Sequence, residues 1–228
     1  AHAEGWPYSP FVLRSLLRAA GLLDGKQPDT EETRSFLEVE RGPALLRLFQ
    51  AWRESVQHND LRLIPHLQAE GEWLNDPLAA RKAVLDLLAQ LDPGRWWSLP
   101  AFIAAIKKQQ PDYQRPAGDY DSWYVKDKRT DTYLRGFEHW EQVDGALIRY
   151  LITGPLHWLG ILDLARPAED QAVIAFRTSS WAQDLLDVRD RTRGGVTAPP
   201  QGLFFVRADY PTRFGLPQLE TPRCRSDL

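Results

Sequence analysis

The run Tyr150–Leu164 constrains the fold of this chain more than any other segment. Apolar residues recur at helical spacing in its first part, and Gly154 followed by Pro155 then ends the helix, because proline has no backbone donor and clashes with the preceding turn. One more helical turn is expected over 156–159, followed by a strand over 161–164. A helix, a sharp break and a strand must therefore follow one another closely.

Similar start and stop signals predict short helices elsewhere in the chain. Asp76 followed by Pro77 predicts a helix start, since aspartate caps the first turn and proline suits the first helical position. The apolar stripe from Val84 to Leu91 continues that helix. The other expected helices begin with capping residues or show one apolar face, and they cover Ser9–Leu23, Asp29–Leu37, Leu45–Val56, Phe102–Ile106 and Ser179–Asp187.

The expected strands are few and short. Residues 95–99 predict one strand, and residues 172–176 predict a partner for the strand at 161–164. Between 112 and 136 the helical period fails, and two short apolar runs flank a polar segment, which indicates a hairpin insertion.

The order of these elements is helix, strand, helix, helix, strand, strand, which is typical of a winged-helix module. An internal echo supports two related units, because Leu17–Asp24 parallels Leu156–Asp163, and a threonine, Thr30 or Thr178, is expected to lead the next helix in each unit. We therefore expect a mainly α fold with small β-hairpins (α+β) and tandem winged-helix-like modules. The expected division is a first half-module at 1–56, a linker at 57–75, a winged-helix module at 76–190 with its insertion at 112–136, and an extended segment with one strand at 191–228.

Composition excludes several classes of protein. The chain is 43% hydrophobic and 26% charged, as in an ordinary globular protein, and its net charge of −3 limits any polyanion-binding surface to a local patch. Charged residues interrupt every apolar stretch, so no membrane span is expected. With one cysteine, no secretory signal and no internal disulfide, a cytoplasmic location is expected. The absence of methionine is consistent with a fragment or with omitted residues, and the oligomeric state stays open.

No motif for catalysis or metal binding is present in the sequence. Histidines and the single Cys224 do not fall at metal-ligand spacing, so no metal or cofactor is expected. His139 and His157 each lie beside tryptophan and are interpreted as packed side chains. Asp119 and Asp121 would share one face of a strand as an acid/base pair requires, but turn-capping residues are the favoured interpretation. The chain is therefore expected not to be an enzyme.

Basic residues near the insertion are the candidate nucleic-acid contacts. Such side chains bind phosphate and position a protein without reading sequence, and a solvated surface is the alternative interpretation. The candidates are Lys107, Lys108, Lys126, Lys128, Arg129, Arg135 and Arg149.

Four short segments carry a resemblance to a known group of proteins: Gly71–Trp73, Asp119–Tyr124, Gly136–Trp140 and Gly154–Gly160. They resemble bacterial winged-helix proteins that are similar to the amino-terminal domain of XPB-type helicases. The resemblance implies a DNA-associated role. No Gly-x-x-x-x-Gly-Lys-Ser/Thr phosphate loop exists in the chain, so the helicase motor itself is excluded.

A second resemblance covers only fragments, Arg129–Asp131 and Thr197–Leu203, which look like parts of tRNA pseudouridine synthases. In that family the aspartate of an Arg-Thr-Asp-x-Gly-Val-x-Ala motif attacks the base. Here Thr132–Leu134 replaces the glycine turn, and the family's fold is expected to be rich in sheet.

These patterns favour a non-enzymatic DNA-binding or helicase-associated winged-helix protein with DNA as its partner. Net negative charge favours the alternative, a protein–protein adaptor that uses the same fold. An RNA-modifying enzyme of the pseudouridine synthase type is the third interpretation.

Overall fold

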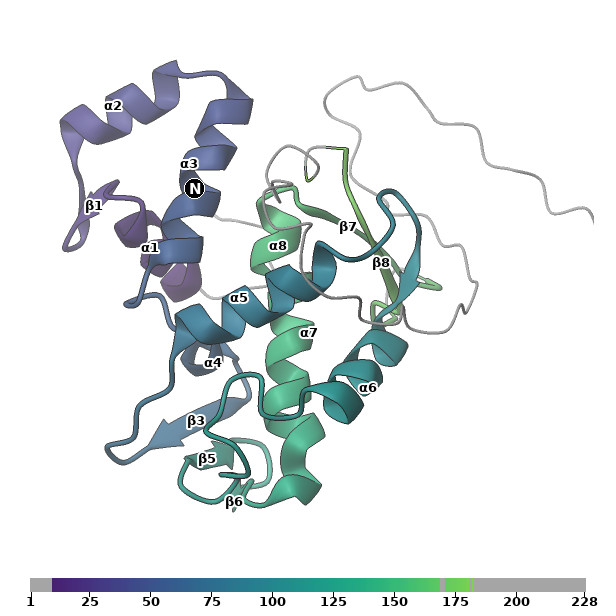
Figure 1. Ribbon diagram of the computed structural model, residues 1–228. Coiled ribbons are helices and arrows are strands. Elements are labelled where there is room, and N and C mark those ends of the chain that lie inside the picture. The colour runs from purple at the N-terminus through teal and green to yellow at the C-terminus, as the bar shows by residue number, and fades with distance from the viewer. Residues whose placement is uncertain (1–9, 169–170, 181, 183–228) are drawn as a thin grey trace, which may run out of the picture.

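The computed structural model describes residues 10–168, 171–180 and 182. Of these residues 48% are helical and 14% lie in strands, which form small antiparallel sheets, so the fold is a mixed α+β one as the sequence predicts (Figure 1). In the described part of the chain no helix is long and apolar enough to cross a membrane. The division into tandem winged-helix modules stays a prediction.

The amino-terminal elements follow the local signals closely. Asp29 caps a helix as predicted, its Oδ1 accepting a hydrogen bond from the Glu32 amide at 3.0 Å. The first helix ends at Ala19, directly before the turn at Gly21 that was expected to stop it, and Gly21 adopts a φ of 70° as the chain turns into a strand. The elements are α1 (Pro10–Ala19), β1 (Leu23–Asp24), β2 (Gln27–Pro28), α2 (Thr30–Glu38) and α3 (Arg41–Glu54).

The segment 57–75, interpreted from sequence as a linker, contains two elements, α4 (Asp60–Leu63) and β3 (Leu67–Glu70). Its apolar side chains Leu61, Ile64 and Leu67 are buried in the main core. β3 pairs with a strand of the insertion far along the chain, so this segment holds the insertion in place.

The elements after residue 76 appear in the predicted order. Asp76 caps the first helix through the amides of Leu78 and Ala79, as expected. The strand predicted at 172–176 runs from 175 to 178, where it pairs on both sides to give the sheet order β4-β8-β7. The elements are α5 (Pro77–Leu88), β4 (Trp97–Ser98), α6 (Leu99–Gln109), α7 (Ala146–Thr153), α8 (Pro155–Trp158), β7 (Leu162–Ala165) and β8 (Ala175–Thr178).

Of the predictions for the carboxyl-terminal part of the chain, one is wrong and two lie almost wholly outside the described residues. Thr178 does not lead a helix, because it is the last residue of β8. The helix predicted over 179–187 and the strand predicted within 191–228 lie almost wholly outside the described residues.

The insertion forms the predicted hairpin from β5 (Tyr124–Asp127) and β6 (Thr132–Tyr133). β3 adds a third strand, and the sheet order is β3-β5-β6. A 3-10 turn at Phe137–His139 and a π-helical turn at Glu141–Gly145 then lead directly into α7. In Figure 1 this sheet lies at the lower end of the molecule, away from α2.

A continuous buried cluster links the helices and two of the sheets. Trp52 and Trp140 are fully buried in it. α7 runs down the middle of the view in Figure 1, directly below α8. Most of its side chains are buried.

The internal echo in the sequence corresponds to repeated backbone geometry. Gly21 and Gly160 both adopt a left-handed conformation, with φ of 70° and 78°. The amide after each glycine bonds back five residues, from Leu22 to Leu17 at 2.9 Å and from Ile161 to Leu156 at 2.8 Å. This pattern is the Schellman motif that ends helices at glycine, and in both copies it leads into a strand.

Candidate functional site

The outward face of the sheet β3-β5-β6 gathers aromatic and charged side chains. Side chains alternate along a strand, so Tyr124 and Lys126 point to one side of β5, while Val125 packs into the core. Lys126 lies opposite Tyr133 of β6 and opposite Gln68 of β3. This outward face, formed by Gln68, Glu70, Tyr124, Lys126 and Tyr133, is called the tyrosine face below.

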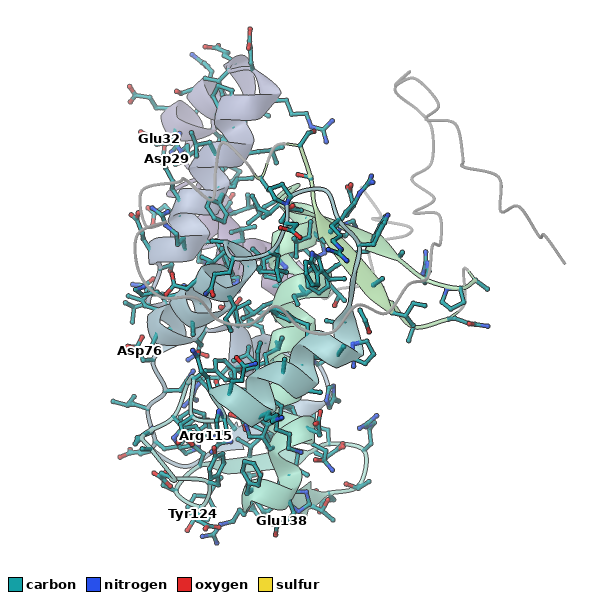
Figure 2. All side chains as sticks on the ribbon, turned by 45° about the vertical axis from the view of Figure 1, so that its right-hand side comes forward. Asp29, Glu32, Asp76, Arg115, Tyr124 and Glu138 are labelled. Carbon is teal, nitrogen blue, oxygen red and sulfur yellow. The ribbon has the colours of Figure 1, made fainter. Side chains whose placement is uncertain are left out.

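The two tyrosines lie edge to face, with ring centroids 6.1 Å apart and an interplanar angle of 90°. Lys126 Nζ lies 5.4 Å from the Tyr133 ring centroid, and Arg135 Cζ lies 5.0 Å from that of Tyr124. Both tyrosines remain 46% exposed. Figure 2 shows Tyr124 at the lower end of the molecule, opposite the end marked by Asp29 and Glu32.

Acidic groups hold this face in one geometry. The Tyr133 hydroxyl donates to Glu70 Oε2 at 2.5 Å, and this hydrogen bond raises the pKa of Tyr133, so the phenol stays protonated at neutral pH. Lys126 Nζ lies 2.7 Å from Asp131 Oδ1, and the hydrogen bond to Asp131 raises the pKa of Lys126. The face is therefore a fixed set of phenols, one ammonium group and carboxylates.

Asp131 lies in the turn between β5 and β6 and is the only non-glycine residue with positive φ among those described, at 58°. Its side chain is 85% exposed. A hydrogen bond joins the neighbouring Thr130 and Thr132 hydroxyls at 2.7 Å. The carboxylate therefore faces solvent at the tip, and Lys126 is its ion-pair partner.

A stack of planar groups supports the sheet from its inner side. Trp73 and Trp123 stack with centroids 4.9 Å apart and an interplanar angle of 14°. Arg62 Cζ lies 4.8 Å from the Trp73 centroid, and Arg115 Cζ lies 4.2 Å from that of Trp123. Cation–π and aromatic contacts of this kind fix the insertion against the body.

Arg115 also anchors the π-helical turn before α7. Its Nε donates to Asp144 Oδ1 at 2.9 Å, and both side chains are buried. Gln114 Nε2 donates to the same oxygen at 2.7 Å, while Asp144 Oδ2 has no hydrogen-bond partner among the described residues. Burial raises the pKa of Asp144 in spite of the nearby guanidinium. The π-turn thus joins the insertion to α7 through a buried polar cluster.

The structure brings four of the seven predicted contacts to the hairpin. Lys128 donates to the Pro65 carbonyl at 3.0 Å, and Arg129 pairs with Asp127 at 2.7 Å, which lowers the pKa of Asp127. Lys126 and Arg135 flank the two tyrosines, as described above.

The other three predicted contacts lie elsewhere. Lys107 pairs with Glu141 at 3.3 Å beside the Trp140 ring, and Lys108 is exposed in the last turn of α6. Arg149 is exposed on α7. The seven residues therefore come from three parts of the fold: the hairpin and its flank, α6 and α7.

The favoured interpretations of the other candidate residues agree with the structure. Asp119 accepts hydrogen bonds from the amides of Asp121 and Ser122, so it caps a turn, as expected. His157 Nδ1 lies 2.9 Å from the Leu162 carbonyl oxygen and joins α8 to β7.

Sequence reasoning missed the tyrosines and Glu70. The alternation of Tyr124 and Lys126 with apolar residues was the available signal for Tyr124. Glu70 had none, because it meets Tyr133 only through the pairing of strands that are distant in the chain.

Comparisons with known proteins give short, local matches. The chain is 55% identical over 42 residues to tRNA pseudouridine synthase A of Nitrosococcus oceani, which covers 18% of this chain and 16% of that protein. The enzyme of the same name from Pseudomonas aeruginosa is 52% identical over 42 residues, and that from Coxiella burnetii is 51% identical over 39. The chain thus spans about a sixth of the length of the curated relatives it matches. No protein-family model and no solved structure matches the chain.

These relatives overturn two expectations. The prediction of a non-enzymatic DNA-binding or helicase-associated protein is wrong, because the matched proteins are named as enzymes that modify tRNA. The expectation that the chain is not an enzyme is corrected by the same finding. The physical reason is that basic side chains contact phosphate in DNA and RNA alike, so their number does not distinguish the two. No comparison bears on the resemblance to XPB-type helicases, which stays a prediction.

Proposed function

We propose that this chain is an RNA-modifying protein of the tRNA pseudouridine synthase type. The observation that carries the proposal is the identity of 51–55% to three such enzymes over about 40 residues. Two fragments of the sequence are consistent with it, Arg129–Asp131 and Thr197–Leu203, which resemble parts of the same family. The second fragment lies outside the described residues.

Asp131 is the carboxylate to test first. It occupies the aspartate position of the Arg-Thr-Asp fragment, and its Oδ1 lies 2.7 Å from Lys126 Nζ, which orients the carboxylate, a group that can act as a nucleophile. The side chain is exposed at the hairpin tip, so an RNA bound across the tyrosine face would lie beside it. The described residues do not enclose a base around Asp131, and any enclosure has to come from the substrate or from the rest of the chain.

Pseudouridine formation provides a direct assay. The bond between the ribose C1′ and N1 of uracil breaks and a bond between C1′ and C5 forms. N1 takes up a proton, and the hydrogen on C5 is released to water. The full chain should release tritium from unmodified tRNA transcripts that carry 5-tritiated uridine. Asp131→Asn should lower the rate by at least about 1000-fold if Asp131 is the nucleophile.

Asp86→Asn is the matched control, because Asp86 is also an exposed aspartate paired with a lysine, Lys82, and it lies on α5, outside the insertion. It should leave the rate unchanged. Absence of tritium release by the wild-type chain from every tRNA tested would overturn the proposal. Normal activity in Asp131→Asn would show that Asp131 is not the nucleophile.

We also propose that the elements from α5 to β8 form a winged-helix module that carries the insertion. The order α5, β4, α6, α7, β7, β8 and the strand order β4-β8-β7 support this arrangement. Backbone chemical shifts of the isotope-labelled chain would test it by giving the helix and strand order independently.

A further inference from the structure

We propose that Tyr124 and Tyr133 form a stacking platform for two unpaired RNA bases, with Lys126 and Arg135 beside them to contact the phosphates. This inference rests on the proposed function and deepens it, because it names unpaired RNA as the form of the substrate that this face binds.

The geometry of the two rings selects for unpaired bases. The rings lie at 90° to each other and both are 46% exposed. Two bases that stack on rings so inclined cannot be parallel, whereas neighbouring bases in a duplex must be. A single strand or a loop can splay its bases, and every base offers an aromatic face for stacking.

The platform is rigid before any ligand binds. Glu70 holds the Tyr133 hydroxyl, and cross-strand pairing fixes Tyr133 opposite Lys126. Behind the sheet, the Trp73–Trp123 stack holds the residue that precedes Tyr124. Figure 2 shows Tyr124 at the lower end of the molecule, with Arg115, which stacks on Trp123, above it. Arg115 is buried, whereas Tyr124 is exposed. Aromatic side chains that are already fixed lose little conformational freedom when a base stacks on them.

The two cations can exchange their partners for phosphate. The side chains of Asp131 and Asp121, which pair with Lys126 and Arg135, are 85% and 73% exposed. Arg135 and Asp121 form an exposed ion pair, which contributes little to stability, so a backbone phosphate can replace Asp121. The Lys126 side chain is only 18% exposed, but Asp131 lies on its solvent side, where a phosphate can take the place of the carboxylate. Cations next to aromatic rings are the combination that binds the backbone and the bases of a single strand together.

Fluorescence anisotropy with a labelled oligouridylate of about 16 nucleotides would test the platform. The full chain should bind it, with an affinity that falls as salt rises, and should bind the same RNA in duplex form more weakly. Tyr124→Ala and Tyr133→Ala should each weaken binding by at least about fivefold.

Three controls make the result specific. Tyr124→Phe should keep the affinity, because it keeps the ring. Phe11→Ala removes an exposed aromatic from α1, outside the platform, and Lys82→Ala removes an exposed cation that pairs with Asp86 on α5. Both should bind like the wild type. If an alanine variant of either tyrosine has an altered circular dichroism spectrum, the leucine variant at that position is measured instead. Leucine keeps the bulk of the side chain without an aromatic ring.

The results separate this inference from the proposed function. Unchanged affinity in both alanine variants overturns the platform, as does equal or tighter binding of duplex RNA, of oligothymidylate or of an oligoglutamate peptide. Tritium release by wild type together with unchanged affinity in the variants leaves the proposed function standing and removes the platform. Affinity that depends on the tyrosines, without tritium release, keeps the platform and removes the proposed function.

Discussion

Arg81 Nε lies 2.7 Å from Asp60 Oδ2, and both side chains are excluded from solvent. The same carboxylate accepts a hydrogen bond from Trp52 Nε1 at 3.0 Å, while Arg81 also donates to the carbonyl oxygens of Ser55 and His58. The ion pair therefore joins α3, α4 and α5 through a network that satisfies both charges.

Asp60→Asn should destabilise the protein by about 3–5 kcal/mol near pH 7, because Arg81 would remain buried without its counter-charge. Urea denaturation would measure the loss. Asp86→Asn, which breaks the exposed pair with Lys82 on α5, is the matched control and should cost at most about 1 kcal/mol. Equal losses in the two variants would contradict this account.

The same carboxylate gives the protein an acid-sensitive stability. Burial alone would raise the pKa of Asp60, but the His58 ring, whose Nε2 lies 3.5 Å from Asp60 Oδ1, and the charge of Arg81 hold this pKa below its ordinary value of 3.8. A group with a lowered folded-state pKa stabilises above its unfolded pKa, and this contribution is lost as the pH falls through the folded value. The free energy of unfolding should therefore decline below about pH 4.

The effect of Asp144 on stability depends on pH in the opposite direction, because burial raises the pKa of this carboxyl group. Its contribution to the free energy of unfolding is present at low pH and is lost as the pH rises. The difference between wild type and Asp60→Asn therefore isolates the Asp60 contribution. That difference should shrink in acid. A difference that is constant across pH would show that Asp60 does not titrate with folding.

Gly160→Ala and Gly21→Ala should each lower the free energy of unfolding by about 1 kcal/mol or more, because alanine is strained at the positive φ of both positions. A methyl group would meet only Leu45 at 3.8 Å in the first case and no atom within 4 Å in the second, so crowding is not the cause. Gly42 lies in the first turn of α3 and has no positive φ. Gly42→Ala should therefore leave the free energy of unfolding unchanged or raise it. Thermal unfolding of the three variants would show whether the two motifs respond alike.

Arg115→Met should loosen the insertion more than the rest of the molecule, because it removes the group that stacks on Trp123 and pairs with Asp144. In this variant the hydrogen exchange of the β5 amides should become faster by a larger factor than that of the α7 amides. Adding Asp144→Asn should recover part of the lost stability, since it removes the uncompensated buried charge. No recovery in the double variant would show that the stacking contact, rather than the charge, dominates.

Local signals in the sequence predicted most of the helices. Caps such as Asp29 and Asp76 act within one turn, so their effect does not depend on distant residues. The break at Gly154 and Pro155 was predicted for the same reason, and α7 and α8 lie on either side of it.

Features that need a distant partner were not predicted. β3 pairs with β5 from Leu67 opposite Asp127 to Glu70 opposite Tyr124, and nothing near residue 67 indicates that strand. The tyrosine face exists only because of this pairing. Arg81 is a different case, because it lies on the apolar stripe of α5, four residues before Leu85, and its position there was an available signal of burial.

The parallel indoles of Trp73 and Trp123 have a spectroscopic consequence. Two identical chromophores whose centroids are 4.9 Å apart couple their electronic transitions, and such coupling gives a paired signal of opposite signs in circular dichroism. One indole belongs to the segment before α5 and the other to the insertion, so the paired signal exists only while the two are docked. The amplitude of this couplet would report the attachment of the insertion separately from the unfolding of the helices.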